Sequence, residues 1–99
     1  MVVIAEEQRD QWFARRAICS LGVGEGVLRA AEDANPDLDW LTVVYALDGI
    51  FTARGGAMAQ VRFLRAHQTT LSGETPLDVL PRPGGPSRVC RAAREYAAA

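Results

Sequence analysis

Residues 71–80 read LSGETPLDVL and combine the signals of a tight turn with those of a short, docked helix. Ser72 and Gly73 favour a turn, and the Thr75 hydroxyl can cap a helix. Pro76 suits the first helical position, because no N–H is needed there. Two prolines within the next three residues end the helix after little more than one turn. Such a helix is unstable alone, so its apolar side chains must pack into a larger core.

The apolar side chains of this helix indicate how it docks. Leu77 and Leu80 lie three residues apart and share one face, with Val79 beside them. Asp78 falls in the first turn, where the helix macrodipole favours a carboxylate. We therefore expect Leu77 and Leu80 to be buried, together with Leu71 from the preceding turn.

The composition is that of one globular domain with unevenly distributed charge. The 99 residues are 48% hydrophobic and carry a formal net charge of −1. Residues 1–49 hold nine acids and four arginines, a balance of −5, whereas residues 50–99 hold three acids and seven arginines, a balance of +4. All eleven basic residues are arginine, which suits bidentate contacts to carboxylate or phosphate. The C-terminal half is therefore the expected contact for an acidic partner.

The sequence contains no recognisable catalytic or metal-binding constellation. Cys19 and Cys90 stand alone, without the spacing of a zinc site or a disulfide framework, which indicates a reducing cytoplasm. His67, the single histidine, is expected to cap a helix end. The apolar start at 2–5 is too short for a signal peptide or a membrane span. We expect a cytoplasmic binding module with no cofactor, no membrane contact and no enzymatic activity.

Apolar residues recur with helical spacing along most of the chain, which predicts an all-α fold of five to six short helices in a single compact domain. Besides the helix that begins at Pro76, helices are expected at 6–21, 25–34, 40–54 and 57–66 and from a Ser87 cap onwards. The residues expected to face inward are Ala14, Ala17, Ile18 and Leu21, then Val27, Leu28, Ala31 and Ala34, then Val61 and Leu64 flanked by Met58 and Phe63, and finally Val89, Cys90, Ala93 and Tyr96.

Residues 41–54 admit two interpretations. Asp48-Gly49 between two apolar runs is typical of a β-hairpin. A continuous helical face is formed, however, by Trp40, Val44, Leu47 and Phe51, with Val43 and Ile50 alongside. Asp37 or Asp39 can cap such a helix, and a glycine pair at 55–56 can end it. We prefer the helix, which would form the core. Gly49 inside it costs about 1 kcal/mol relative to alanine and permits the close approach of a neighbour.

The two N-terminal helices and the glycine-rich turn at 22–26 resemble a helix–turn–helix, which raises DNA binding as an alternative function. The second helix carries Glu25, Arg29, Glu32 and Asp33, three acids against one base, without Asn, Gln or Lys to read base edges. We interpret this part as a degenerate helix–turn–helix, and its charges argue against direct DNA binding. Under the alternative, the chain is a transcriptional regulator that acts as a dimer or in a toxin complex.

Residues 63–96 resemble the toxin-binding C-terminal region of the MbcA/ParS/Xre antitoxins. The resemblance rests on an aromatic-apolar pair at Phe63-Leu64, the pattern Leu-x-Gly-x-Thr-Pro-Leu-x-x-Leu over 71–80, a glycine turn at 84–85 and an arginine-rich helix with Val89 near its start. It covers roughly a third of the chain, and the hydrophobic helix at 40–54 also fits this family. The chain departs from the family where Phe63 replaces a common Trp and where the common Asn-Pro before the motif is missing.

The resemblance implies an antitoxin of a type II toxin–antitoxin system that neutralises a RES-domain, NAD-consuming toxin by blocking its NAD pocket. Residues 1–56 would form the N-terminal helical region and residues 57–99 the toxin-binding region, and a homodimer or a toxin–antitoxin hetero-oligomer is compatible with this role. The terminal helix should face away from the acidic half of the chain. The residues expected to serve partner binding are Leu71, Gly73, Thr75, Pro76, Leu77 and Leu80, which build and hold the loop, and Arg82, Arg88, Arg91 and Arg94, which would contact the toxin.

Overall fold

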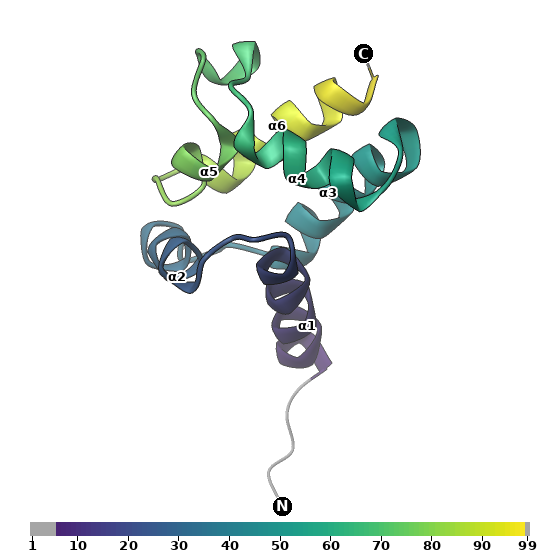
Figure 1. Cartoon of the computed structure of the whole chain (residues 1–99). Coiled ribbons are helices and arrows are strands. Elements are labelled where there is room, and N and C mark those ends of the chain that lie inside the picture. The colour runs from purple at the N-terminus through teal and green to yellow at the C-terminus, as the bar shows by residue number, and fades with distance from the viewer. Residues whose placement is uncertain (1–5, 99) are drawn as a thin grey trace, which may run out of the picture.

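The computed structural model describes residues 6–98 and confirms the all-α fold, because no strand occurs in this range. Six α-helices and one 3₁₀ turn follow each other along these residues (Figure 1). They are α1 (Glu6–Ser20), α2 (Glu25–Ala34), α3 (Trp40–Arg54), α4 (Ala57–Arg65), the 3₁₀ turn η1 (Thr69–Leu71), α5 (Pro76–Val79) and α6 (Gly85–Ala98). The 3₁₀ turn is the element that the sequence did not predict.

α3 is one continuous helix, so the hairpin interpretation is wrong. The Asp39 carboxylate accepts the N–H of Leu41 at 3.0 Å at the start of the helix. Gly55 ends the helix in the left-handed conformation, at φ 97°. Gly49 lies inside the helix and faces α6, since a Cβ at this position would be 3.8 Å from the Cβ of Ala97. The small residue thus contributes to the close approach of the two helices.

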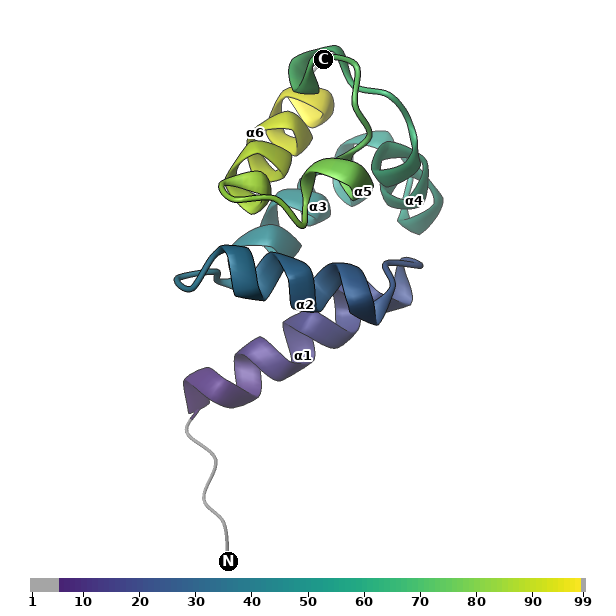
Figure 2. The ribbon, with the colours of Figure 1, turned by 90° about the vertical axis from the view of Figure 1, so that its left-hand side faces the viewer.

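α3 lies in the middle of the fold and joins its two ends. It packs most extensively on α6, and then on α1 and α4. Two perpendicular views place α1 and α2 at one end of the molecule and α4, α5 and α6 at the other (Figure 1 and Figure 2). The largest fully buried side chains come from nearly every segment and are Ile18, Val23, Leu28, Leu47, Ile50, Phe63, Leu64, Leu71, Pro76, Val79, Leu80 and Val89. The prediction that α3 forms the core is confirmed.

The buried face of α3 is rotated relative to the predicted one. Val43 and Ile50 are buried, whereas Val44 is half-buried and Phe51 is 52% exposed. Because α3 carries apolar side chains on every side, its sequence does not indicate which side packs against the rest of the chain. The neighbouring helices determine that side.

The other predicted inward faces are confirmed only in part. Leu21, Val27 and Tyr96 are half-buried and pack against the core, as predicted. Contrary to prediction, Ala17 is exposed and Ala34 and Val61 are only half-buried, and Met58, expected beside the inward face, is exposed. Gln60 was not expected inside, yet it is buried and its Nε2 donates to the carbonyl oxygen of Leu47 at 2.8 Å, which ties α4 to α3. These differences arise because a short helix is covered only where another helix crosses it.

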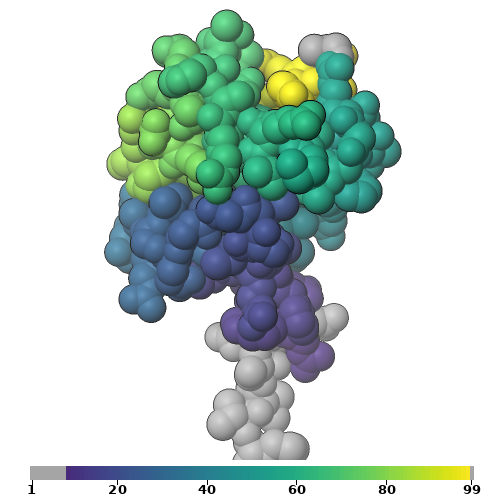
Figure 3. Space-filling model, viewed as in Figure 1, coloured from purple at the N-terminus to yellow at the C-terminus, as the bar shows by residue number. Residues whose placement is uncertain are grey.

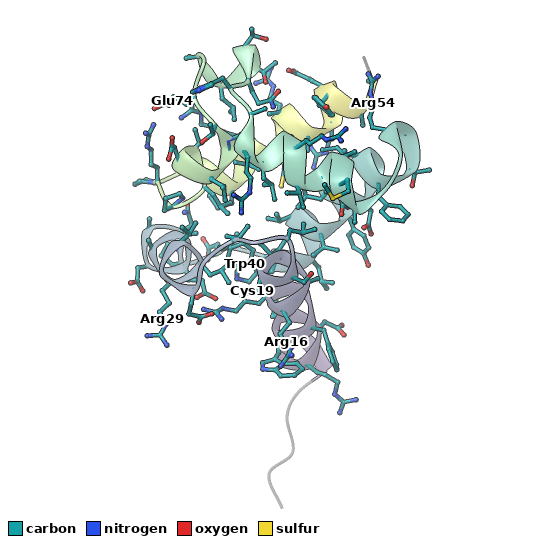
Figure 4. All side chains as sticks on the ribbon, viewed as in Figure 1. Arg16, Cys19, Arg29, Trp40, Arg54 and Glu74 are labelled. Carbon is teal, nitrogen blue, oxygen red and sulfur yellow. The ribbon has the colours of Figure 1, made fainter. Side chains whose placement is uncertain are left out.

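A polar network centred on Arg15 of α1 joins the first three helices. The guanidinium pairs with Glu25 at 2.6 Å and with Glu32 at 2.9 Å, both on α2. Glu32 also accepts the indole N–H of Trp40, at the start of α3, at 3.0 Å (Figure 4). Burial raises the pKa of Glu32, but the hydrogen bonds from Arg15 and Trp40 outweigh it, so this pKa lies below its ordinary value.

Acid should destabilise the protein through this network. The pKa of Glu32 is lower in the folded chain than its ordinary value of 4.5, so the unfolded chain takes up the proton first as the pH falls. The free energy of unfolding should therefore decrease below about pH 4.5. Urea unfolding at several pH values measures this, and Glu32→Gln should lower stability at neutral pH and flatten the dependence.

Glu95→Gln is the control for this measurement, because it removes an exposed carboxylate at the other end of the molecule. It should keep most of the pH dependence of the unmodified chain. An identical pH dependence in the Glu32→Gln variant and in the unmodified protein would contradict the role assigned to Glu32.

Candidate partner-binding surface

A closed loop over residues 67–74 connects α4 to α5. The backbone of Gln68 closes it, since its N–H donates to the carbonyl of Glu74 at 3.0 Å and its carbonyl accepts the N–H of Gly73 at 2.9 Å. The Gln68 side chain donates to two carbonyl groups at the end of α4, at 3.2 and 3.3 Å. Gly73 has φ 83°, a backbone conformation that favours glycine. The loop is therefore held by its own hydrogen bonds.

His67 belongs to this loop and does not cap α4 as predicted. Its Nδ1 lies 2.7 Å from the carbonyl oxygen of Gly73, a hydrogen bond that requires the proton on Nδ1. Ala66, which precedes it, has left the helical conformation at ψ 148°, so the chain turns His67 away from the helix end. The Gln68 side chain contacts the end of α4 instead.

The predicted cap of α5 is confirmed. Thr75 Oγ1 accepts the N–H of Asp78 at 3.2 Å, and Pro76 occupies the first turn of the helix. This hydroxyl satisfies a backbone donor that has no partner within the helix. α5 therefore begins at a fixed residue despite its length of four residues.

The docking face of α5 differs from the predicted one. Val79 and Leu80 are fully buried together with Pro76, whereas Leu77 is only half-buried. Positions i, i+3 and i+4 of a helix share one face, so burial of Pro76 carries Val79 and Leu80 inward. Leu77 still packs against the core, as predicted, but from the edge of this face. The fully buried leucines that hold this region are Leu71 and Leu80.

α6 begins directly against the end of α5, and this contact requires a glycine. Gly85 is buried, and a Cβ on it would overlap the carbonyl oxygen of Val79 and lie 2.8 Å from that of Leu80. Backbone oxygens held in a helix cannot rotate away as a side chain can. The helix thus begins two residues before the predicted Ser87 cap, because the backbone at Gly84 already accepts the N–H of Arg88 at 3.2 Å.

Asn35 connects the start of α6 to the N-terminal half of the chain. Its Nδ2 donates to the carbonyl of Arg82 at 3.0 Å and to that of Ala31 at 2.9 Å. Its Oδ1 accepts the N–H of Gly84 at 2.7 Å. The amide therefore joins the end of α2 to the loop between α5 and α6, two regions whose surfaces adjoin in the space-filling view (Figure 3).

α6 buries one face and exposes three of the predicted arginines. Its buried residues include Val89, Cys90, Ala92 and Ala93. Arg88, Arg91 and Arg94 are exposed, and at about 100° per residue they cover an arc of about 120° on the outer side of the helix. Of these three arginines, Arg91 forms an ion pair with Glu95 of the same helix, at 3.6 Å.

The helix packs through its apolar residues on α3, most of which belongs to residues 1–49, and Arg94 lines a groove with Asp37 and Asp39. The expectation that the terminal helix faces away from the acidic half is therefore wrong, although Arg88 and Arg91 point to solvent.

Two of the predicted arginines lie at one hollow between η1 and α6. This hollow has a volume of about 310 Å³, and Leu71, Arg88 and Arg91 contribute to its wall. Thr70 and Glu95 complete its polar rim. We refer to it as the α6 hollow. It combines a buried leucine that fixes the turn with two exposed guanidinium groups.

The other two predicted arginines lie apart from the α6 hollow. Arg82 pairs with Glu74 at 2.6 Å, and this contact holds the pKa of the Glu74 carboxyl below its ordinary value. Arg94 faces a groove of about 450 Å³ that α6 forms with residues 35–39. The structure therefore favours Arg88 and Arg91 over Arg82 and Arg94 as a joint contact surface.

Other chemistry is sparse in the described part of the chain. Burial raises the pKa of the Cys90 thiol, which keeps it protonated and unreactive. Among the side chains that the structure describes, residues 9–98, no cluster of three or more His, Cys, Asp or Glu is able to hold a metal ion. Within residues 6–98 no helix has both the length and the apolar character needed to cross a membrane.

Comparison with protein-family models, curated proteins and solved structures finds no match to this chain.

Sequence reasoning missed Gly85 and Asn35 as residues that position this surface. Gly84-Gly85 indicated a turn, but nothing in the sequence distinguishes the glycine that meets the backbone of α5 from its neighbour. Asn35 before a proline indicated a helix end, which is confirmed, while its bonds to residues 47 and 49 positions away have no local signal.

Gly85→Ala should destabilise the protein by at least about 2 kcal/mol, because the new Cβ must displace the end of α5. Thermal unfolding followed by circular dichroism measures the effect. Gly26→Ala is the matched control, since a Cβ there meets nothing within 4 Å and lies inside α2. It should raise stability by about 0.5–1 kcal/mol. Equal effects of the two substitutions would contradict the contact between Gly85 and α5.

Asn35→Ala should cost about 1–3 kcal/mol, since it leaves the N–H of Gly84 and the carbonyl of Arg82 without their partner. Amide hydrogen exchange should show faster exchange at Gly84. Asn35→Asp keeps the shape and the acceptor but loses the donor, so it should restore protection at Gly84 only partly. Unchanged exchange at Gly84 in the alanine variant would refute the connection.

Proposed function

We propose that this chain is the antitoxin of a type II toxin–antitoxin system and neutralises a RES-domain, NAD-consuming toxin by direct binding at its NAD pocket. The observation that carries the proposal is the α6 hollow, where the 71–80 motif fixes the turn and Arg88 and Arg91 are presented to solvent. The resemblance of residues 63–96 to the MbcA/ParS/Xre antitoxins is the reason for proposing a RES-domain toxin as the partner. The chain acts as a binding module in the cytoplasm, without catalysis of its own.

The proposed inhibition is electrostatic and steric. A site for a dinucleotide includes acidic groups on its rim, and an arginine can enter where a phosphate or a ribose would lie. Arg91 is 82% exposed and Glu95 is its partner at 3.6 Å, a weak pair that a better acidic partner can replace. Arg88 stands one turn before Arg91 on the same side of α6. The apolar face of α6 is committed to α3, so the arginine side remains for the toxin.

The alternative, DNA binding through α2, has less support. Glu25 and Glu32 remain accessible on the surface of α2, and their pairs with Arg15 remove only part of their repulsion of phosphate. The exposed residues that remain on α2 include Arg29 and Asp33, which together offer no net positive charge. A major-groove helix depends on several cationic contacts. Binding to operator DNA that weakens steeply with salt would favour this alternative.

The proposal is tested with the protein encoded by the adjacent open reading frame. Both full chains are purified, and NAD consumption by the neighbour is measured with increasing amounts of this chain. Arg88→Glu and Arg91→Glu should each weaken inhibition at least about tenfold, because a repelling charge replaces an attracting one at the interface. Circular dichroism should show that both variants remain folded, since both positions are exposed.

Arg29→Glu is a matched control for Arg91→Glu. Both arginines are largely exposed, at 74% and 82%, and each pairs weakly with a glutamate four residues away, at 3.5 and 3.6 Å. The control should inhibit like the unmodified chain. The proposal fails if the neighbour consumes no NAD or if this chain does not inhibit it. The arginines would be removed from the mechanism if Arg82→Glu and Arg94→Glu, like Arg88→Glu and Arg91→Glu, all left inhibition unchanged.

A further inference from the structure

Two adjoining hollows form one groove along the seam between α3 and α6. The first, of about 450 Å³, lies between α6 and the loop before α3, and Figure 2 shows the turn after α2 on the same side of the molecule as the start of α6. The second, of about 550 Å³, lies between α3 and the end of α6. Thr42 of α3 and Arg94 of α6 line both hollows and mark their junction. We call the pair the α3–α6 groove, whose first part is lined by residues that include Asp37, Asp39 and Cys90 and whose second part by residues that include Ala46, Gly49 and Ala97.

Opposite charges line the first part of the groove without forming an ion pair. Asp37 and Asp39 belong to the loop before α3, whereas Arg94 belongs to α6. Among the side chains described for residues 9–98, none of the ion pairs joins Arg94 to either acid, so these charges lie farther apart than about 4 Å. A molecule that carries both a cation and an anion can therefore contact both sides of the groove at once.

The charged groups of the groove are ionised and can accept further contacts. The hydrogen bond from the Gln11 amide holds the pKa of Asp39 below its ordinary value, so this carboxylate is charged at neutral pH. Asp39 Oδ2 accepts the Thr42 hydroxyl at 3.2 Å, and a carboxylate oxygen has room for a second donor. The Arg94 charge lowers the pKa of the Cys90 thiol against the effect of burial, which places the guanidinium near the buried side of the groove.

The second part of the groove is apolar and lined by small residues. Ala46 and Gly49 line it from α3 and Ala97 from α6, while Tyr45, 69% exposed, stands at its edge. Small residues leave space that a large side chain of a ligand can occupy. A volume of about 550 Å³ is within the range of sites that bind small molecules, which are lined mainly by apolar groups.

We propose that the α3–α6 groove binds a free α-amino acid with a large apolar or aromatic side chain. The ligand carboxylate contacts Arg94 at the junction, the ammonium group contacts Asp37 and Asp39, and the side chain lies in the second part. In an α-amino acid one carbon atom carries all three groups, which matches a junction between an acidic part and an apolar part. A peptide matches less well, because its N-terminus has no carboxylate and its C-terminus has no ammonium group.

This site is separate from the α6 hollow, so the inference does not depend on the proposed toxin binding. Arg88 and Arg91 line the α6 hollow, and neither of them lines the α3–α6 groove. Amino-acid binding is measured on the isolated chain. Its failure therefore leaves the proposed inhibition untouched, and a failure of inhibition leaves the groove untouched.

Titration of the full, isotope-labelled chain with L-phenylalanine, followed by amide chemical shifts, tests the inference. The expected result is saturable binding with a dissociation constant of about 1 mM or tighter, an affinity that a ligand of this size can reach. The largest shifts should occur at Thr42, Val43, Gly49 and Arg94, which line the groove. L-Alanine should bind at least about tenfold more weakly, because it leaves the apolar part empty. N-Acetyl-L-phenylalanine and L-phenylalaninamide each lack one charge and should show a similar loss.

Arg94→Gln and Asp37→Asn should each weaken the binding of L-phenylalanine at least about tenfold, because each removes one charged contact. Both side chains are exposed, so the variants should keep the circular dichroism spectrum of the unmodified chain. Arg62→Gln on α4 and Asp33→Asn on α2 are the matched controls, since both side chains are exposed and lie outside the groove. The controls should leave the dissociation constant unchanged.

Three outcomes would overturn the inference. The first is the absence of saturable shifts up to about 20 mM L-phenylalanine. The second is equal affinity for L-phenylalanine and for L-alanine or either blocked analogue, because the groove would then not recognise all three groups of the amino acid. The third is unchanged binding in both the Arg94→Gln and the Asp37→Asn variant, because the ligand would then lie elsewhere.

Discussion

The packing of α6 on α3 is the contact on which the rest of the fold depends. Both helices present small residues to each other, with Gly49 and Ala46 on α3 and Ala93 and Ala97 on α6. Small side chains let two helices approach closely and gain dispersion contacts along their length. The contact also joins residues from the two halves of the sequence. The N-terminal and C-terminal regions therefore form one hydrophobic core.

This contact also determines what the arginines can do. A helix that commits its apolar face to the core must present its polar face to water or to a partner. Arg88 and Arg91 thus reach solvent beside the turn built by the 71–80 motif, where Leu71 is buried below them. The buried residues of the motif would then act on binding indirectly, by fixing the start and direction of α6. Gly85 and Asn35 likewise position the helix, whereas other side chains would touch another molecule.

Polar contacts fix the arrangement of the remaining helices around this core. Arg15 holds α2 against α1 and, through Glu32, reaches Trp40 at the start of α3. Gln60 holds α4 to α3, and Asn35 holds the end of α2 to the loop before α6. Each of these side chains satisfies backbone or charged groups that would otherwise be costly to leave unpaired. The small domain combines a modest core with a few directional bonds.

The sequence by itself determined the helices, since hydrophobic spacing, the Thr75 and Asp39 caps and the glycine and proline breaks all act within a few residues. It also indicated the acidic and basic halves and the turn at 71–80. Only the tertiary structure decided which side of α3 is buried, why position 85 requires a glycine, what Asn35 binds, and which arginines share a hollow. The reason is physical: an apolar helix gives no local preference among its sides, and contacts between residues distant in sequence depend on how the helices cross.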